Sequence, residues 1–474
     1  MSPDRRRCLI LLGLSVAVHT AAAIAVHVTV GGVDGYAFRS VDGQEYYRLG
    51  VNLTHHGSFS TSESAPFAPD TWRTPGYPLF LSFFIALFGD SPLMLVIVQQ
   101  GLRVLNVALF FLLARRWLGL NRGFLAAVVF LLDPYGLYYS FWLMSETWFV
   151  TVLLAAWWAW ARALERDRSG GFAWTGALSA FLVLVRPVGL LVPVVLWVGL
   201  VIRACSSRLA NQNGNHAAAN GSVRQWVGPI CFTIAGGLVL GSWMLRNKIV
   251  AEHFAISNQG GVVLAYFKAT EVALWNEGRT TDRYLETSLD PARINDPHPV
   301  WDEIDRRLHG MLFGVPEAVR QTLTWRSLAQ GNRSDSDPFP VSEALVRIGR
   351  SMLLESPMST GICCLWRGFW LLMFPMDLAV QPPHGVEINR GRSFVLGAFY
   401  ALLALAACRG LVRGRGSWTN HYFAVGATLA LLAAATPQID PRFRVPMIPL
   451  MLVLAFSPPR RRSNQPVTSE SVNG

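Results

Sequence analysis

The stretch CLILLGLSVAVHTAAAIAVHVTV, residues Cys8–Val30, contains no Asp, Glu, Lys or Arg. A run of this length can cross about 30 Å of hydrocarbon as an α-helix. It must be helical, because lipid cannot satisfy the hydrogen-bonding groups of the backbone. Further long apolar blocks follow, and hydrophobic residues make up 52% of the chain against 15% charged residues. The sequence therefore predicts an all-α integral membrane protein, a polytopic bundle of about 10–12 transmembrane helices.

The same stretch could instead be a cleaved signal peptide, with Ala21–Ala23 as the cleavage region. It is long for that role, so we expect a retained first helix over about 9–30. Arg5–Arg7 precede this helix, and cationic side chains are enriched on the cytoplasmic side of membrane helices. We therefore expect the N-terminus to lie in the cytoplasm. We also expect a multi-pass protein of the inner (cytoplasmic) membrane.

The formal net charge is +11, from 41 Lys and Arg against 30 Asp and Glu. Much of the excess lies in clusters at predicted helix ends, such as Arg115–Arg116, Arg409–Arg415 and Arg460–Arg462. This distribution indicates membrane topology, and we expect no nucleic-acid partner. The cysteines lie outside the long polar segments and show no zinc-type spacing, so neither a disulfide framework nor a protein-bound metal is predicted.

Polar segments divide the chain into four predicted units: an N-terminal transmembrane module 1–245 that includes a first extracytoplasmic loop 31–91, a larger extracytoplasmic lobe 246–357, C-terminal transmembrane helices 358–457, and a disordered cytoplasmic tail 458–474. After the first helix, the spans are predicted at 93–114, 122–140, 142–163, 172–186, 188–203, 226–245, 394–411, 420–436 and 444–457. Residues 77–88 are too few to cross the bilayer comfortably and predict an interfacial helix. Residues 361–379 are interpreted as partial or re-entrant, and 206–222 as a flexible cytoplasmic loop.

Acidic residues gather at the outer helix ends, where membrane packing does not explain them. Asp42 and Glu45 would share one face if their segment is helical. Asp70 and Arg73 lie in a rigid turn before the interfacial helix. Glu146 lies near an apolar helix, where an ionisable group indicates a functional site. The alternatives are a solvated amphipathic surface for the first pair and a helix cap for Glu146.

A set of arginines breaks the positive-inside pattern at the same predicted outer ends. Guanidinium groups bind phosphate oxygens in a bidentate manner, so these side chains would suit a lipid phosphate. Snorkelling to headgroups would explain some of them, and so would a general preference for arginine, because Lys248 and Lys268 are the only lysines. The arginines concerned are Arg186, Arg246, Arg442 and Arg444.

Several common catalytic motifs are missing. The sequence has no Gly-Lys pair, which excludes a phosphate-binding loop of the Gly-Lys-Ser/Thr type. It also has neither a His-Glu-x-x-His zinc motif nor a Gly-x-Ser-x-Gly nucleophile turn.

The order of the remaining motifs resembles bacterial GT-C glycosyltransferases, most closely glycosyltransferase family 39 and the aminoarabinose- and mannosyl-transferase-like membrane proteins. The resemblance covers nearly the whole chain and rests on Asp42 with Tyr46-Tyr47, RTPGYPLFL (73–81), LMSET (143–147), LVRP (184–187), Arg246-Asn247 with FAISNQGG (254–261), and DPRFRVPMIP (440–449). It implies an enzyme that transfers a sugar from a polyprenyl-phosphate donor, on the extracytoplasmic face, to an acceptor that could be a protein, a lipid or an envelope polymer.

In such families a carboxylate of the first outer loop acts as the base, and Asp42 matches that position. A second acidic residue often precedes the proline turn of that loop, but Trp72 and Arg73 occupy the place here, with Asp70 nearby. A sugar phosphoester carries a good leaving group, so the reaction needs a base for the acceptor hydroxyl and cations for the departing phosphate. A single displacement with inversion would follow.

This chemistry assigns each candidate residue a role. Asp42 is the predicted base, with Glu45 and Glu146 as supporting catalytic carboxylates. The lipid-linked sugar donor is the expected cosubstrate, and a divalent cation could act in place of an arginine, although the supply of arginines makes it less necessary. The predicted substrate-binding residues are Asp70, Arg73, Arg186, Arg246, Arg442 and Arg444.

Two other functions fit parts of the sequence. A transporter or flippase of lipid-linked sugars would suit Arg103 and Arg186, but it predicts an inverted repeat, which the sequence lacks. A non-catalytic assembly partner would account for the lobe 246–357 but not for the ordered motifs.

Overall fold

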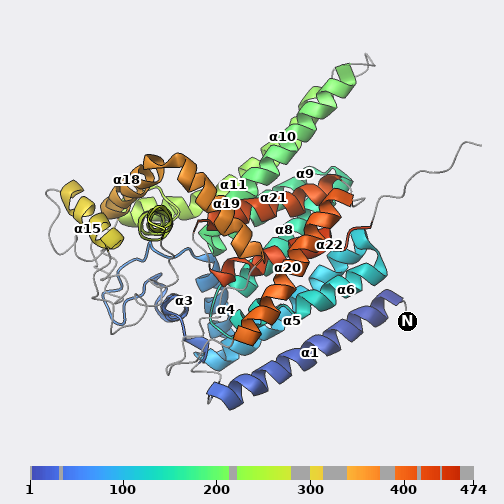
Figure 1. Ribbon diagram of the computed structural model, residues 1–474, viewed down its shortest axis with the longest axis horizontal. Coiled ribbons are helices and arrows are strands. Elements are labelled where there is room, and N and C mark those ends of the chain that lie inside the picture. Colours follow the sequence, from blue (N-terminus) through green and yellow to red (C-terminus); the bar gives the residue numbers. More distant parts are fainter. Residues whose placement is uncertain are drawn as a thin grey trace, which may run out of the picture.

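The computed structural model describes residues 3–30, 32, 36–212, 221–278, 299–312, 339–373, 390–413, 418–437 and 440–458. Every regular element in these ranges is a helix (Figure 1), which confirms the all-α prediction. Six helices are long and apolar enough to cross a membrane, and five shorter apolar helices accompany them, so the chain is a multi-pass membrane protein. The six long stretches are Pro3–Thr29, Pro92–Leu118, Glu146–Arg166, Pro187–Ser206, Gln225–Ala251 and Val395–Val412.

The helices of the N-terminal half are α1 (Pro3–Val30), α3 (Val41–His56), α4 (Gly76–Phe88), α5 (Pro92–Leu118), α6 (Leu120–Leu131), α7 (Pro134–Tyr139), α8 (Glu146–Arg166), α9 (Ser169–Val185), the 3-10 turn η1 (Pro187–Leu190), α10 (Leu191–Gln212) and α11 (Gly221–Ala251). Figure 1 shows α1 along one edge of the bundle and α10 extending away from it.

The second half begins with α12 (Gln259–Val262), the π-helical segment η2 (Val263–Ala269), α13 (Thr270–Asn276), α15 (Pro299–Met311) and α18 (Phe339–Glu355). It continues with α19 (Pro357–Met373), α20 (Arg390–Arg413), α21 (Trp418–Ala435), the 3-10 turns η3 (Pro441–Phe443) and η4 (Val445–Met447), and α22 (Ile448–Ala455).

Three predicted boundaries are wrong. The span 122–140 is divided, because Pro134 disfavours a helical conformation at Asp133 and so ends the first helix before it. The flexible loop 206–222 is helical where the structure describes it: α10 continues to Gln212 through residues that favour helix, and α11 begins at Gly221. Arg246 lies inside α11, not at the start of the lobe.

Two other predictions extend beyond the described residues. Within the segment predicted to be re-entrant, 361–379, the structure describes the part that belongs to α19 and ends at Met373. Of the predicted tail 458–474, it describes only residue 458.

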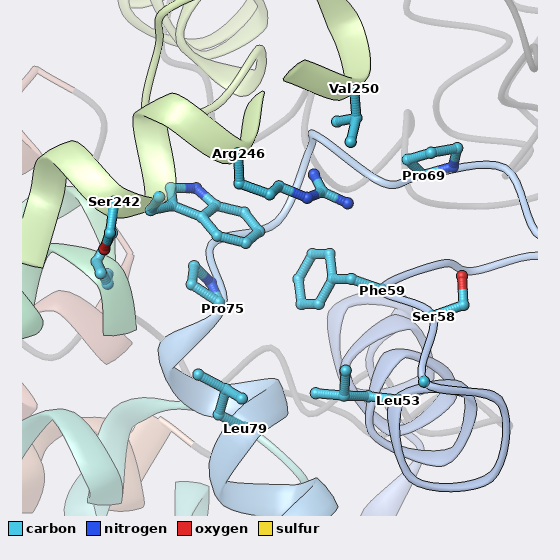
Figure 2. Close-up of a pocket in the computed structure, with 12 residues that line it drawn as sticks. Leu53, Ser58, Phe59, Pro69, Pro75, Leu79, Ser242, Arg246 and Val250 are labelled. Carbon is cyan, nitrogen blue, oxygen red and sulfur yellow. The ribbon is translucent and has the colours of Figure 1, made fainter. Parts of the chain in front are cut away.

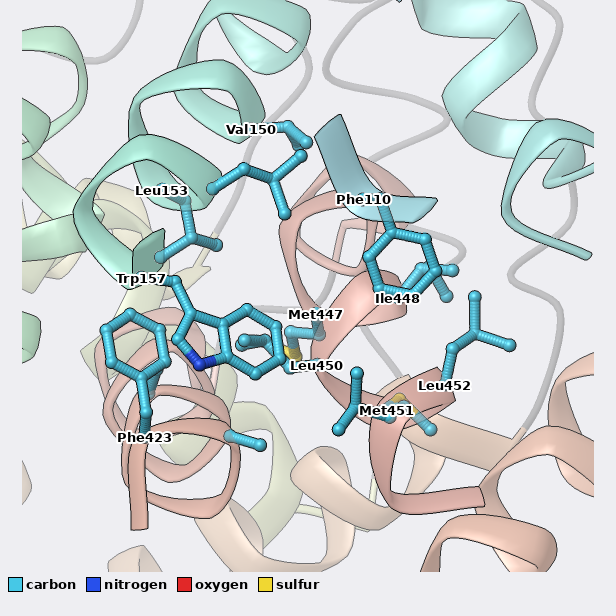
Figure 3. Packing of buried hydrophobic residues seen from close by; sticks show 14 of the residues in the cluster. Phe110, Val150, Leu153, Trp157, Phe423, Met447, Ile448, Leu450, Met451 and Leu452 are labelled. Atoms are coloured by element: carbon cyan, nitrogen blue, oxygen red, sulfur yellow. The ribbon is translucent and has the colours of Figure 1, made fainter. Parts of the chain in front are cut away.

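The main core lies where α5 and α8 meet the C-terminal helices. Trp157 of α8 is fully buried and stacks on Phe423 of α21, with ring centroids 5.0 Å apart. Met447 and Leu450 pack beside this pair (Figure 3). The last helices of the chain are therefore packed against the N-terminal helices, which allows residues near position 440 to reach the segment between α1 and α4.

A smaller core holds together the described parts of the predicted lobe. Trp301 and Ile304 of α15 pack against Leu345 and Ile348 of α18, and Trp72, from the loop between α3 and α4, joins the same cluster. The lobe and the first loop therefore share a core, away from the main bundle (Figure 1).

Helices α9 and α11 approach closely at Gly176. A Cβ added there would lie 2.2 Å from the carbonyl oxygen of Phe232, so the two backbones leave no room for a side chain. Small residues at such crossings are typical of membrane helix pairs.

We expect Gly176→Ala to destabilise the protein in detergent by about 1–3 kcal/mol, because α9 and α11 must move apart. Gly237→Ala on α11 is the matched control, since no described atom lies within 4 Å of its added Cβ. Thermal unfolding midpoints measure both effects. Equal midpoints for the two variants would show that the close approach does not contribute to stability.

Candidate active site

The first site element is α3, which brings two predicted carboxylates onto one face. The Ser40 hydroxyl caps the helix by accepting a hydrogen bond from Gly43 N at 3.2 Å. Asp42 and Glu45 therefore lie in the first turn, three residues apart and on the same side. The opposite surface of this turn is close to the bundle, because a Cβ on Gly43 would lie 3.1 Å from the Leu143 carbonyl oxygen.

Arg73 lies between these two carboxylates. Its Nε donates to Glu45 Oε2 at 2.7 Å, and its Nη2 contacts Asp42 Oδ1. The guanidinium also lies 5.0 Å from the centroid of the Tyr46 ring. The Arg73 side chain is buried, so its charge depends on the two acidic partners.

Asp70 holds the turn that presents Arg73. Its Oδ1 accepts hydrogen bonds from the backbone N–H groups of Trp72 at 3.0 Å and of Arg73 at 2.8 Å. This is the local pattern by which aspartate fixes a turn. The predicted substrate-binding residue Asp70 is therefore turned toward the backbone.

A second guanidinium reaches Asp42 from the far end of the sequence. Arg442 in η3 donates from Nη1 to Asp42 Oδ2 at 2.8 Å, and its Nε lies 2.8 Å from Asp440 Oδ2. Burial raises the pKa of Asp42, but Arg73 and Arg442 together outweigh it and hold the pKa well below its ordinary value. Asp42 is therefore ionised at neutral pH, and its side chain is 27% exposed.

A second ion pair lies beside the first. Glu146 begins α8, and its Oε1 accepts from Arg186 Nη1. The guanidinium groups of Arg186 and Arg442 each lie 5.7 Å from the centroid of Phe443, so the two pairs share this ring. Glu146 is only 1% exposed, and its Oε2 has no hydrogen-bond partner in the described structure.

A cavity of about 520 Å³ lies next to the turn at 70–75. Arg246 of α11 extends across it toward Phe59 (Figure 2), and its Nη1 donates to the Asp70 carbonyl at 2.6 Å. Within the described ranges, no carboxylate forms an ion pair with Arg246. The other lining residues are mostly apolar and come from α3, α4, α9, α11 and the loop between α3 and α4: Leu53, Gly57, Ser58, Phe59, Pro69, Pro75, Leu79, Leu184, Ser242, Trp243 and Val250.

Arg444, the remaining predicted arginine, does not join this cluster. It is 0% exposed, donates from Nε to the Leu371 carbonyl at 2.5 Å and lies over the Tyr400 ring. Tyr400 in turn donates to Asp133 Oδ1 at 2.6 Å. The sequence does not predict this buried polar network, because a tyrosine within an apolar helix is usually a packing residue. The Asp-Pro step at 133–134 was the available signal.

The structure brings together six of the predicted residues from distant parts of the chain: Asp42, Glu45, Arg73, Glu146, Arg186 and Arg442. Among the described residues, no group of three or more His, Cys, Asp or Glu could hold a metal ion. In this cluster, arginines carry the positive charge beside the carboxylates. The arrangement provides an ionised carboxylate, a second carboxylate with an available oxygen, and several cations at the end of the membrane helices.

Comparison with known proteins extends this description. The model of the dolichyl-phosphate-mannose-protein mannosyltransferase family matches residues 72–222. No curated protein matches the chain. Among solved structures, ArnT from Cupriavidus metallidurans bound to undecaprenyl phosphate is 13% identical, with a TM-score of 0.37 over 94% of this chain and 77% of that chain. Its apo state gives 13% identity and a TM-score of 0.33 over 93% and 77%. Scores this low do not establish a shared fold.

The family match begins at Trp72, next to Arg73, and continues through Glu146 and Arg186, which are residues of the ion-pair cluster. The matched range therefore contains both apolar helices and residues of the ion-pair cluster. Over residues 72–222 the chain is therefore similar to the dolichyl-phosphate-mannose-protein mannosyltransferases.

Proposed function

We propose that this enzyme transfers a sugar from a polyprenyl-phosphate donor to an acceptor hydroxyl on the extracytoplasmic side of the inner membrane. The observation that carries the proposal is the ionised Asp42, held by Arg73 and Arg442 in the first turn of α3. The matched family is described as using dolichyl-phosphate mannose, which is a polyprenyl-phosphate sugar.

The cavity beside Arg246 suits the donor lipid. Its walls are largely apolar, as a polyprenyl chain requires, and they include side chains of α4 and α11. Arg246 supplies a positive charge that no described carboxylate neutralises by an ion pair. A guanidinium in this setting binds phosphate strongly. In this proposal the donor phosphate lies between Arg246 and the Arg73–Arg442 pair, with the sugar toward Asp42.

Asp42 then acts as the general base. The acceptor oxygen attacks the anomeric carbon as Asp42 takes the hydroxyl proton, and the bond from that carbon to the phosphate oxygen breaks. The electron pair of this bond leaves with the phosphate, so negative charge grows there and attracts Arg73 and Arg442. Movement of these cations toward phosphate raises the pKa of Asp42 and hence its strength as a base. One displacement inverts the anomeric configuration.

Glu146 supports the same reaction by binding the donor sugar. Its Oε1 is paired with Arg186, whereas Oε2 is buried without a hydrogen-bond partner in the described structure. A buried carboxylate oxygen without a donor is unfavourable. A sugar hydroxyl would supply that donor when the donor substrate binds, and Glu45 would keep Arg73 in place.

The pH dependence of the enzyme should depend on Arg442. Asp42 acts as a base only when ionised, so activity is lost as the pH falls through its pKa. An ordinary aspartate titrates near pH 4. Because Arg73 and Arg442 lower the pKa of Asp42, we expect the acid limb of the wild-type kcat/KM profile to lie below that value. Arg442→Ala removes one cation and should move the limb to higher pH.

The matched control for this profile is Arg347→Ala. Arg347 lies on α18 and is exposed, at 4.0 Å from Glu343, far from Asp42 in the sequence and in a different ion pair. It should leave the acid limb unchanged. An identical limb in Arg442→Ala and wild type would show that Asp42 does not titrate in the free enzyme as proposed.

The reaction itself is tested with membranes that contain the full chain, a labelled polyprenyl-phosphate sugar and candidate acceptors. Transfer of label to an acceptor, with inverted anomeric configuration in the product, is the expected result. Movement of the labelled lipid between leaflets without transfer would favour a transporter. Retained configuration would exclude the single displacement.

A further inference from the structure

Two arginines close together in the sequence have opposite surroundings. Arg442 faces Asp42, whereas Arg444 points into the bundle and is 0% exposed. The short turns η3 and η4 meet at this point, and Met447 N donates to the Arg444 carbonyl at 2.8 Å. The position of Arg442 therefore depends on how firmly Arg444 is held.

Arg444 is held by three separate parts of the chain. Its Nε donates to the Leu371 carbonyl of α19 at 2.5 Å. Its guanidinium lies 4.2 Å from the centroid of the Tyr400 ring of α20 and 5.5 Å from that of Tyr135 of α7. Such cation–π contacts are strongest where water is excluded.

Tyr400 is itself fixed by Asp133. The Tyr400 hydroxyl donates to Asp133 Oδ1 at 2.6 Å and accepts from Tyr135 N at 3.3 Å. The rings of Tyr135 and Tyr400 are stacked, with centroids 5.3 Å apart. Asp133 also caps α7 by accepting from Gly136 N at 2.9 Å. The hydroxyl of Tyr400 therefore connects α7 to α20, and the Arg444 guanidinium lies over the ring of the same tyrosine.

Packing alone does not account for this network. Asp133, Arg444 and Arg103 are all buried, and Arg103 Nη2 lies 4.0 Å from Asp133 Oδ2. Charged groups buried in a membrane protein are costly and are usually associated with function. Apolar residues of similar volume would fill the same space at a lower cost in desolvation free energy. None of these three groups contacts Asp42 in the proposed reaction, so their role must be indirect.

We propose that Asp133 and Tyr400 are positioning residues that act through Arg444 to hold Arg442 against Asp42. The inference rests on the proposed function, in which Arg442 stabilises the departing phosphate. The network fixes Arg444, Arg444 fixes the junction of η3 and η4, and that junction aims the Arg442 guanidinium. Loss of the Tyr400 hydroxyl would loosen this junction while leaving the aromatic ring in place.

The test variant is Tyr400→Phe, and the matched control is Tyr422→Phe. The Tyr422 hydroxyl also donates a hydrogen bond inside the bundle, to the Val195 carbonyl at 2.5 Å, but it is not part of the network. We expect Tyr400→Phe to lower kcat about 2- to 10-fold, the usual range for one lost hydrogen bond, with a smaller change in the donor KM, because Arg442 acts on the charge that develops in the transition state. Tyr422→Phe should leave kcat unchanged.

A double-mutant cycle separates positioning from general destabilisation. In the Arg442→Ala background, Tyr400→Phe should cause no further fall in kcat, because the group that it positions is already absent. Multiplicative effects of the two substitutions would overturn the proposal, since they would show that Tyr400 acts independently of Arg442.

Hydrogen exchange of residues 440–447 gives a readout that needs no enzyme activity. Tyr400→Phe should increase exchange in this segment, and Tyr422→Phe should not. Increased exchange in a protein that transfers no sugar would leave the positioning role intact and refute the proposed function. Unchanged exchange together with unchanged kcat, in an active enzyme, would refute the positioning role alone.

Discussion

Replacing Asp42 by asparagine is expected to lower kcat for sugar transfer by about 100- to 10,000-fold, the range that general-base catalysis supplies. Asparagine has nearly the same shape and keeps one oxygen that can accept a hydrogen bond from Arg73 or from Arg442, but it cannot take up the acceptor proton. The donor KM should change much less, because the cavity beside Arg246 is untouched. The measurement is transfer from a labelled polyprenyl-phosphate sugar under saturating donor.

Two control variants accompany this experiment. Asp167→Asn makes the same chemical change at an exposed ion pair with Arg203 at 3.0 Å and should leave kcat unchanged. Glu45→Gln weakens the 2.7 Å contact with Arg73 but keeps Asp42, so kcat should fall by much less. If Asp42→Asn inserts normally and transfers sugar at the wild-type rate, another group must be the base, and Glu146 would be the next candidate.

The structure also shows what local sequence patterns can and cannot predict about this protein. The long apolar blocks predict the membrane helices, because the requirement for internal backbone hydrogen bonding depends only on composition and length. The shared face of Asp42 and Glu45 follows from helical spacing. Boundaries were less well predicted: α10 continues to Gln212 through Arg208, Leu209 and Ala210, which are good helix formers, although serine and asparagine lie beside them.

Long-range pairing could not be predicted from the sequence. Asp42 and Arg442 lie 400 residues apart, and only the packing of the last helices on the first module brings them together. For the same reason Arg442 and Arg444 look equivalent in the sequence, although one faces Asp42 and the other is fully buried. Asp70 is predicted to bind substrate, yet its carboxylate accepts hydrogen bonds from the backbone of the turn that carries Arg73.

The arginines of the site divide into two electrostatic classes. Arg73, Arg186 and Arg442 each form an ion pair with a carboxylate, so an incoming phosphate must compete with that partner. Arg246 contacts a backbone carbonyl and the Asn247 side chain, which leaves its charge available to an anion. The first contact of a lipid phosphate should therefore be with Arg246, and the paired arginines should respond later, as charge develops.

Arg246→Ala is accordingly expected to raise the donor KM about 10- to 100-fold, the effect of losing a hydrogen bond to a charged group, while kcat at saturating donor falls much less. Lys248→Ala is the matched control, because Lys248 is a cation on the same helix whose Nζ donates to the exposed Glu252 carbonyl at 2.6 Å. Arg246→Lys, which keeps the charge without the bidentate geometry, should restore part of the affinity.

Arg246 also holds the Asp70 carbonyl, so a rise in KM alone could reflect a displaced turn and not a lost phosphate contact. Inhibition by polyprenyl phosphate and by the uncharged polyprenol distinguishes the two. A phosphate contact predicts that Arg246→Ala weakens inhibition by the phosphate and leaves inhibition by the alcohol unchanged. Equal weakening of both would mean that Arg246 shapes the apolar cavity, and the donor phosphate would then have to be bound by an arginine that first releases its carboxylate.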